Sequence, residues 1–66
     1  MKLKDMLNLI YGGDAVSIQD GEGKVRFNGM VTDFWKLPET NDKDVLLATE
    51  VSRVRSYQYC TVILLK

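Results

Sequence analysis

The sequence predicts an α+β fold: an N-terminal amphipathic helix, a β-hairpin, a short helical turn and a second strand pair, with one four-stranded, mainly antiparallel sheet that carries the helices on one face. Three observations predict it. Apolar residues first recur at helical spacing, then alternate with period two, and after the only proline they return as two apolar runs. The 66 residues are enough for a single domain, 1–66, with a small core.

The first predicted element is an amphipathic helix over residues 3–11. Asp5 lies in its first turn, where a negative charge suits the helix dipole. The pair Gly12–Gly13 follows and predicts the exit turn. Four apolar residues share one face at the spacing i, i+3, i+4, i+7, namely Leu3, Met6, Leu7 and Ile10.

A β-hairpin is predicted next, because apolar and polar residues alternate over residues 16–19 and 25–31. The turn formers of Asp20–Lys24 lie between the two runs. Gly21–Lys24 has some likeness to a phosphate-binding loop, but its glycine spacing is wrong and a strand follows it, so we interpret it as the hairpin turn. Gly29 predicts a bulge or a close approach by the packed helix.

The region around the proline predicts a short helical turn. Thr32 can cap a turn over residues 33–37, which Pro38 ends. Residues 39–44 are predicted to form a polar loop.

Two further strands are predicted over residues 45–51 and 57–65, with the turn between them near Arg53–Ser56. The last strand is apolar on both faces, which predicts a central position in the sheet or a place in a dimer interface. Val62 and Leu64 would point one way, and Ile63 and Leu65 the other.

The composition argues against catalysis. The chain has no histidine, so the usual general base and the commonest metal ligand are missing. Its single cysteine, Cys60, borders an apolar run, which predicts a buried, inert thiol. The acidic side chains show no metal-binding spacing and are interpreted as solvated loop charges. We therefore expect no enzyme, no metal and no cofactor.

Localisation and partners are constrained by charge and hydropathy. Nine basic and nine acidic residues give a net charge of zero, so no overall field draws the chain to nucleic acid or anionic lipid. No apolar stretch has the length of a signal sequence or a membrane helix. The expectation is a cytoplasmic protein with no membrane partner.

The segment from residue 53 to residue 59 is the most suggestive one. In an extended chain its two arginines and two tyrosines would share a face, an arrangement suited to single-stranded nucleic acid. The alternative is an exposed sheet face on which Glu50 pairs with an arginine. The four residues are Arg53, Arg55, Tyr57 and Tyr59.

Phe34 and Trp35 form a second candidate contact. Tryptophan is common in binding hot spots. In so small a domain, however, a lone tryptophan more often closes one end of the core, here with Phe34 and Leu37 alongside.

The order of core and turn positions over residues 4–38 is similar to that of a known group of small proteins. The pattern Lys4-Asp5-Met6-Leu7, then Val16-x-Ile18-x-Asp20-Gly21-x-Gly23-x-Val25-x-Phe27-x-Gly29-x-Val31-x-Asp33-Phe34, resembles small uncharacterised proteins of bacterial prophages and conjugative elements. The resemblance implies a mobile-element setting, a compact α+β fold and no known catalysis. It assigns no functional residue.

The functional expectation is a non-enzymatic accessory protein that acts through contact with an unidentified protein partner. A second copy of the chain is one expected partner, since an open sheet leaves two edges and a small core gains stability by pairing. The alternative is a weak nucleic-acid-binding module that uses the arginine–tyrosine face.

Overall fold

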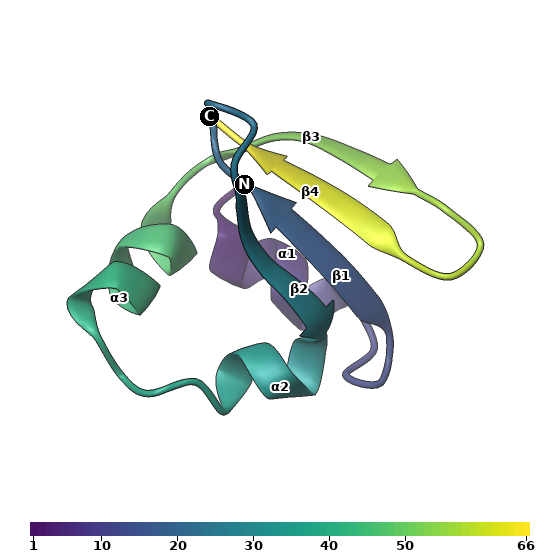
Figure 1. Ribbon diagram of the computed structural model, residues 1–66, viewed down its shortest axis with the longest axis horizontal. Coiled ribbons are helices and arrows are strands. Elements are labelled where there is room, and N and C mark those ends of the chain that lie inside the picture. The colour runs from purple at the N-terminus through teal and green to yellow at the C-terminus, as the bar shows by residue number, and fades with distance from the viewer.

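The computed structural model describes residues 1–66 and contains a single mixed sheet with three helices. The strands lie in the order β2-β1-β4-β3, with β1 antiparallel to β2 and parallel to β4, and β3 antiparallel to β4 (Figure 1). The predicted α+β class is confirmed. The elements are α1 (Leu3–Leu9), β1 (Ala15–Gln19), β2 (Val25–Met30), α2 (Val31–Trp35), α3 (Asn41–Ala48), β3 (Val51–Ser56) and β4 (Thr61–Leu65).

The core lies between one face of the sheet and the helices. Because side chains alternate along a strand, the buried residues of β1 and β4 all belong to the same face. Helix α1 lies behind this sheet in the view of Figure 1, so the opposite face is turned to the viewer. The buried cluster consists of Leu3, Leu7, Val16, Ile18, Val31, Phe34, Ile63 and Leu65.

The central position predicted for the last strand is confirmed, since β4 lies between β1 and β3. Ile63 and Leu65 enter the core, whereas Val62 and Leu64 are half-buried on the other face. A central strand without a helix on one side therefore leaves apolar surface accessible there.

The prediction for residues 39–51 was wrong. Asn41–Ala48 is a helix, α3, where a polar loop and the first part of a strand were expected, and β3 begins only at Val51. The cause is local: the Thr40 hydroxyl accepts a hydrogen bond from the Lys43 N–H at 3.2 Å and caps the helix. Asp42 and Asp44 add negative charge to its first turn.

The predicted position of the last turn was also wrong. Strand β3 continues through Arg53–Ser56, and the turn is formed by Tyr57–Cys60. The Tyr57 N–H donates to the Cys60 carbonyl at 2.8 Å and closes it. Residues 53–56 stay extended because each pairs with a residue of β4.

Three smaller expectations are corrected. Helix α1 ends at Leu9 rather than at residue 11. Helix α2 begins at Val31 after Met30, so Thr32 lies inside it and is not its cap. At Gly29 the close neighbour is a ring, not a helix: a Cβ there would lie 3.2 Å from Cζ of Phe27. The register shift in this strand pair occurs beyond Gly29, between Ile18 and Gln19.

The predicted hairpin turn at Asp20–Lys24 is confirmed. Oδ1 of Asp20 accepts hydrogen bonds from the N–H groups of Glu22 at 2.9 Å and Lys24 at 3.0 Å. The bond from Lys24, with those from Glu22 and from Arg26 at 3.5 Å from Oδ2, holds the pKa of Asp20 below its ordinary value against the opposing effect of desolvation. The Asp20 carboxylate thus accepts hydrogen bonds from backbone N–H groups of the turn that would otherwise lack a partner in the protein.

Lys43 joins α2 to α3 and is the one buried charged residue, with 4% of its surface exposed. Its ammonium donates to the carbonyls of Trp35 at 3.1 Å and Leu37 at 2.9 Å, and to Oε1 of Glu39 at 3.0 Å. All three N–H donors are therefore used, and two of them satisfy the carbonyl of Trp35, the last residue of α2, and that of Leu37 just beyond the helix. Sequence reasoning missed this residue.

Candidate functional site

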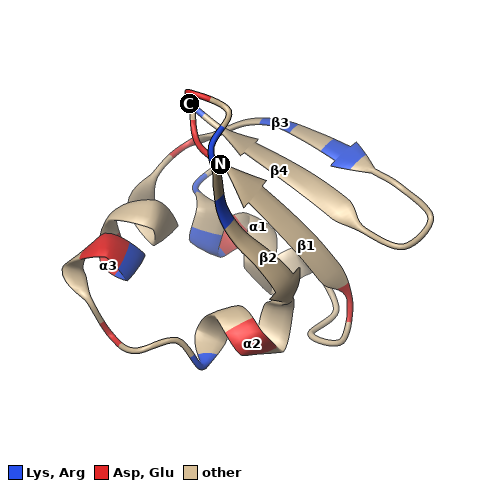
Figure 2. Ribbon diagram, in the orientation of Figure 1, with Lys and Arg blue, Asp and Glu red and all other residues tan.

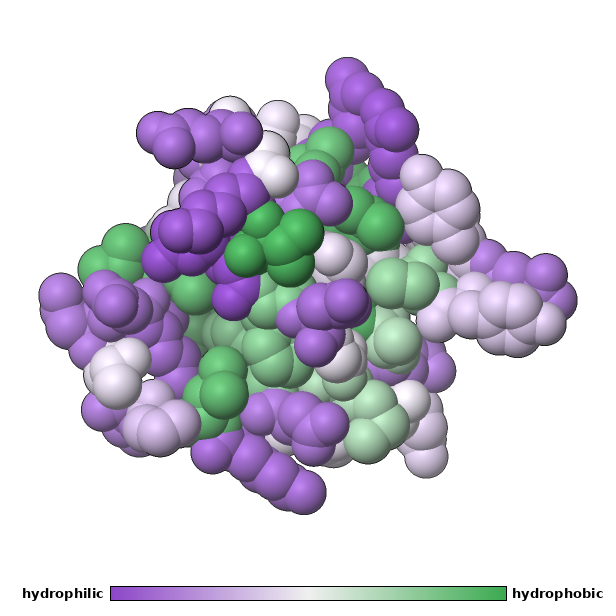
Figure 3. Space-filling model, viewed as in Figure 1, coloured by the Kyte–Doolittle hydropathy of each residue, from purple (hydrophilic) through white to green (hydrophobic).

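The sheet face away from the helices is not covered by another element, and we call it the open face. Its residues follow from strand register: Arg53 lies opposite Leu64, and Arg55 opposite Val62, on the face remote from the core. Figure 3 shows apolar surface in the middle of this view, with hydrophilic side chains around it. The open face comprises Ser17, Gln19, Asn28, Met30, Arg53, Arg55, Val62 and Leu64.

The two arginines of the open face have no acidic partner. The ion pairs of the protein are Met1 with Glu50, Arg26 with Asp20 and Lys43 with Glu39. No aspartate or glutamate occurs between residues 51 and 66, and Figure 2 shows β3 with basic positions alone. This end of the sheet is therefore locally positive although the chain is neutral.

The pairing of Glu50 with an arginine, one of the predicted alternatives, is not formed. The Glu50 carboxylate instead binds the amino group of Met1 at 2.9 Å. That hydrogen bond and the positive charge of the amino group hold the pKa of Glu50 below its ordinary value. Arg53 and Arg55 both stay exposed to water as a result.

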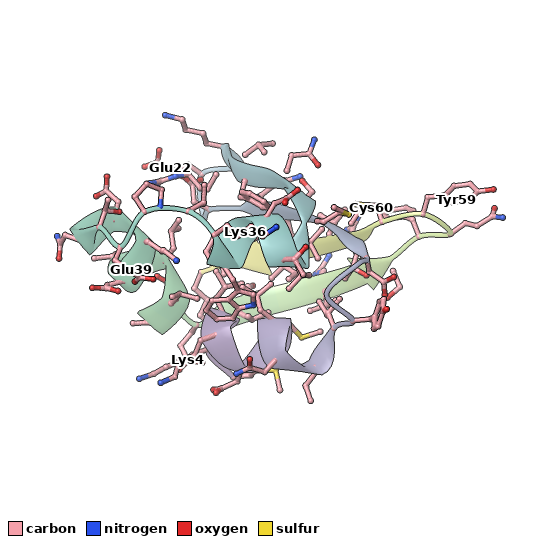
Figure 4. All side chains as sticks on the ribbon, turned by 90° about the horizontal axis from the view of Figure 1, so that it is seen from below. Lys4, Glu22, Lys36, Glu39, Tyr59 and Cys60 are labelled. Carbon is pink, nitrogen blue, oxygen red and sulfur yellow. The ribbon has the colours of Figure 1, made fainter.

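The tyrosines lie beyond the end of β3, and Tyr59 does not continue the arginine row. Tyr57 begins the turn and Tyr59 lies within it, with 83% of its surface exposed. Tyr59 projects from the tip of the β3–β4 hairpin (Figure 4), where its hydroxyl accepts a hydrogen bond from the Gln58 amide at 3.1 Å. The structure thus brings Arg53 and Arg55 together and separates Tyr59 from them.

A cavity of about 340 Å³ adjoins the hairpin turn, between the residues that precede β1 and those that precede β4. Cys60 is half-buried in its wall rather than fully buried, and Sγ lies 3.7 Å from the Thr61 carbonyl. The lining residues are Gly13, Asp14, Ala15, Tyr57, Gln58, Tyr59, Cys60 and Thr61.

Phe34 and Trp35 have different roles. Phe34 is completely buried and packs edge-to-face on Phe27 at 5.2 Å, so its prediction as a partner contact was wrong. Its ring fills the space between α2 and β2. Trp35 lies edge-to-face on Phe34 at 5.9 Å and keeps 39% of its surface exposed. It packs on the buried Phe34 and still presents part of its surface to solvent.

A second cavity, of about 260 Å³, lies beside Lys43 and is lined mainly by residues of the segment from α2 to α3. Lys43 is its buried charge, but its donors are already used by the protein. No group of three or more histidine, cysteine, aspartate or glutamate side chains could hold a metal ion. None of the helices has the length and apolarity needed to cross a membrane.

Comparison with protein-family models, with curated proteins and with solved structures found no match to this chain. The resemblance to mobile-element proteins therefore stays a prediction.

Proposed function

We propose that this protein is a non-enzymatic interaction module that contacts a protein partner through the open face and the adjoining β3 strand. The observation that carries the proposal is the position of Val62 and Leu64, which stay half-buried in the middle of a sheet face with no helix over it. Covering them would remove apolar surface from water, which is the main favourable term in association.

The border of this apolar strip supports the same role. Arg53 and Arg55 flank Val62 and Leu64 and are exposed and unpaired. Arginine is enriched in protein interfaces because its guanidinium forms several directed hydrogen bonds while its stem packs on apolar groups. A partner with an acidic, partly apolar surface fits this composition.

A nucleic-acid-binding module is the second candidate, supported by the unpaired arginines with Tyr57 and Tyr59 close by in sequence. Two observations weaken it. Tyr59 lies at the tip of the turn, away from the arginine row. Two cations also release few counterions, so affinity from phosphate contacts would be small.

Affinity capture from the native host tests the proposal, with three forms of the tagged chain. The wild type and a control variant, Lys4→Glu with Lys36→Glu, should retain the same protein, because these lysines lie on helical segments outside the open face. The variant Arg53→Glu with Arg55→Glu should lose it. Retention by all three forms would contradict the proposed surface.

Titration with labelled single- and double-stranded oligonucleotides at two salt concentrations separates the second candidate. Binding that falls steeply with salt and disappears on Arg53→Ala with Arg55→Ala would favour nucleic acid over protein. No binding at low salt would exclude it.

A further inference from the structure

Strand β3 forms one edge of the sheet (Figure 1). At its start the Val51 N–H donates to the Met1 carbonyl at 2.8 Å, and beyond this residue no other element pairs with the outer side of the strand. Such an edge presents backbone N–H and C=O groups that can pair with an additional strand. Five of its six residues are exposed, including Val54 with 37% of its surface accessible. The edge is therefore available to a partner backbone.

The register identifies which backbone groups are available. The Tyr57 N–H bonds to Cys60, and in an antiparallel ladder the hydrogen-bonded pairs alternate with non-bonded ones. Counting back along β3, Arg55 and Arg53 direct their N–H and C=O groups at β4. Val54 and Ser56 direct theirs outward.

The side chains of the same strand determine the preferred partner sequence. Arg53 and Arg55 lie on the open face, while Val54 lies opposite Ile63 on the core side. A strand added to this edge would place every second side chain beside the arginines and the intervening ones beside Val54. Alternating acidic and apolar residues therefore complement the edge on both faces.

A second copy of the chain fits this edge poorly. Antiparallel pairing centred on Val54 would place Arg53 opposite the partner subunit's Arg55. A shift that pairs Val54 with the partner subunit's Ser56 would place Arg55 opposite the partner subunit's Arg55. Like charges directly opposite each other destabilise a strand pair.

We propose that the β3 edge binds an extended acidic segment of a partner protein by strand addition, with acidic side chains two residues apart that pair with Arg53 and Arg55. This inference rests on the proposed interaction function and identifies the partner chemistry. The backbone groups of Val54 and Ser56 hold the added strand, and the arginines select its charge.

The test uses the full chain labelled with ¹⁵N and two capped peptides, Thr-Glu-Val-Glu-Val-Thr and Thr-Lys-Val-Lys-Val-Thr. The glutamate peptide should shift the amide signals of β3, and the lysine peptide should bind at least about tenfold more weakly. In the variant Arg53→Glu with Arg55→Glu this preference should reverse, whereas Lys4→Glu with Lys36→Glu should leave it unchanged. A variant that binds the lysine peptide must be folded, so this reversed preference excludes a general loss of folding as the cause.

Hydrogen exchange separates strand addition from simple charge attraction. With peptide at ten times its Kd, exchange of the Val54 and Ser56 amides should slow by about tenfold, because the bound state protects them. The Arg53 and Arg55 amides, already bonded to β4, should change little.

Several results would overturn the proposal, each in a distinct way. Shifts confined to Ser17, Val62 and Leu64, without protection of Val54, would leave the proposed function standing and remove strand addition. Absence of binding by either peptide at millimolar concentration would remove it as well. Displacement of the glutamate peptide by a single-stranded oligonucleotide would favour nucleic acid, and protection that rises with protein concentration alone would favour a second copy.

Discussion

Replacing Lys43 by methionine tests whether this buried lysine stabilises the fold. The substitution keeps the length and most of the apolar stem while removing the ammonium. Replacement of buried charges by apolar residues can stabilise proteins, provided that the partner groups also leave. Here the partners are the backbone carbonyls of Trp35 and Leu37, which no side-chain substitution removes. We therefore expect Lys43→Met to lower the free energy of unfolding.

The magnitude follows from the three hydrogen bonds. Each bond from a charged donor to a carbonyl contributes about 1.5–3 kcal/mol, and the lower end applies because the adjacent cavity admits water to the carbonyls. Glu39, whose side chain is 80% exposed, returns to water and costs little. Removing the ammonium also removes its desolvation cost, which brings the net effect below the sum of the two carbonyl bonds. The net expectation is a loss of about 2 kcal/mol.

Thermal unfolding followed by the fluorescence of Trp35 measures the effect next to the substituted site. For a domain of this size, 2 kcal/mol corresponds to a Tm lower by roughly 8–16 °C. The matched control, Glu39→Gln, should change stability by less than about 0.5 kcal/mol. A Lys43→Met protein as stable as the wild type would refute the reasoning, and an equal loss in Glu39→Gln would show that the ion pair, not the carbonyl bonds, stabilises the α2–α3 junction.

Three further predictions concern local structure. Thr40→Ala removes the cap of α3 and should cost about 1 kcal/mol in urea denaturation, whereas Thr32→Ala, at a threonine that caps nothing, should cost less than half of that. Gly23 has φ +84°, so Gly23→Ala should destabilise by about 1 kcal/mol although no atom lies near the added methyl group; a neutral effect would contradict the strain. Because the pKa of Asp20 is lowered in the folded state, its contribution to stability is complete above its ordinary pKa of 3.8 and is lost as the pH falls through the lower folded value. Asp20→Asn should therefore reduce the loss of stability on acidification, measured as Tm against pH, and an unchanged acid profile would exclude Asp20 as a contributor.

Patterns of side-chain spacing predicted the elements that pack directly on the core. The spacing of Leu3 and Leu7 identified α1, and the alternation around Val16 and Ile18 identified β1. Because one face of each element is buried, its apolar residues recur at the helix or strand period, and this spacing can be recognised in the sequence. The apolar residues of β4 likewise indicated its central position.

Helix α3 could not be found in this way because it buries little apolar surface. Leu46 and Leu47 only flank the core, and Val45 is 57% exposed, so no helical apolar stripe exists. The signal that was present lay at its N-terminus, where Thr40 precedes Asp42 and Asp44. The apolar run over residues 45–47 outweighed it and suggested a strand.

The candidate site was predicted in part. Arg53 and Arg55 were identified from their spacing, and they do share a face. The turn at Tyr57–Cys60 carries no glycine, proline, asparagine or aspartate, so nothing in the local sequence located it. Its position depends on the pairing of β3 with β4, and the parallel pairing of β1 with β4 depends on contacts between distant segments.

The edge position of β3 explains why its sequence can be devoted to contact. Its side chains contribute little to the core: Val51 alone packs against it, and residues 52–56 are exposed. Substitution of exposed residues away from such contacts usually changes stability by less than about 0.5 kcal/mol. We therefore expect Arg53→Glu with Arg55→Glu to unfold in urea within about 0.5 kcal/mol of the wild type. If it does, any loss of binding reports the contact itself. A larger loss of stability would mean that the arginines support the sheet. Loss of binding by this variant would then not be informative, and only its gain of affinity for the lysine peptide would report the contact.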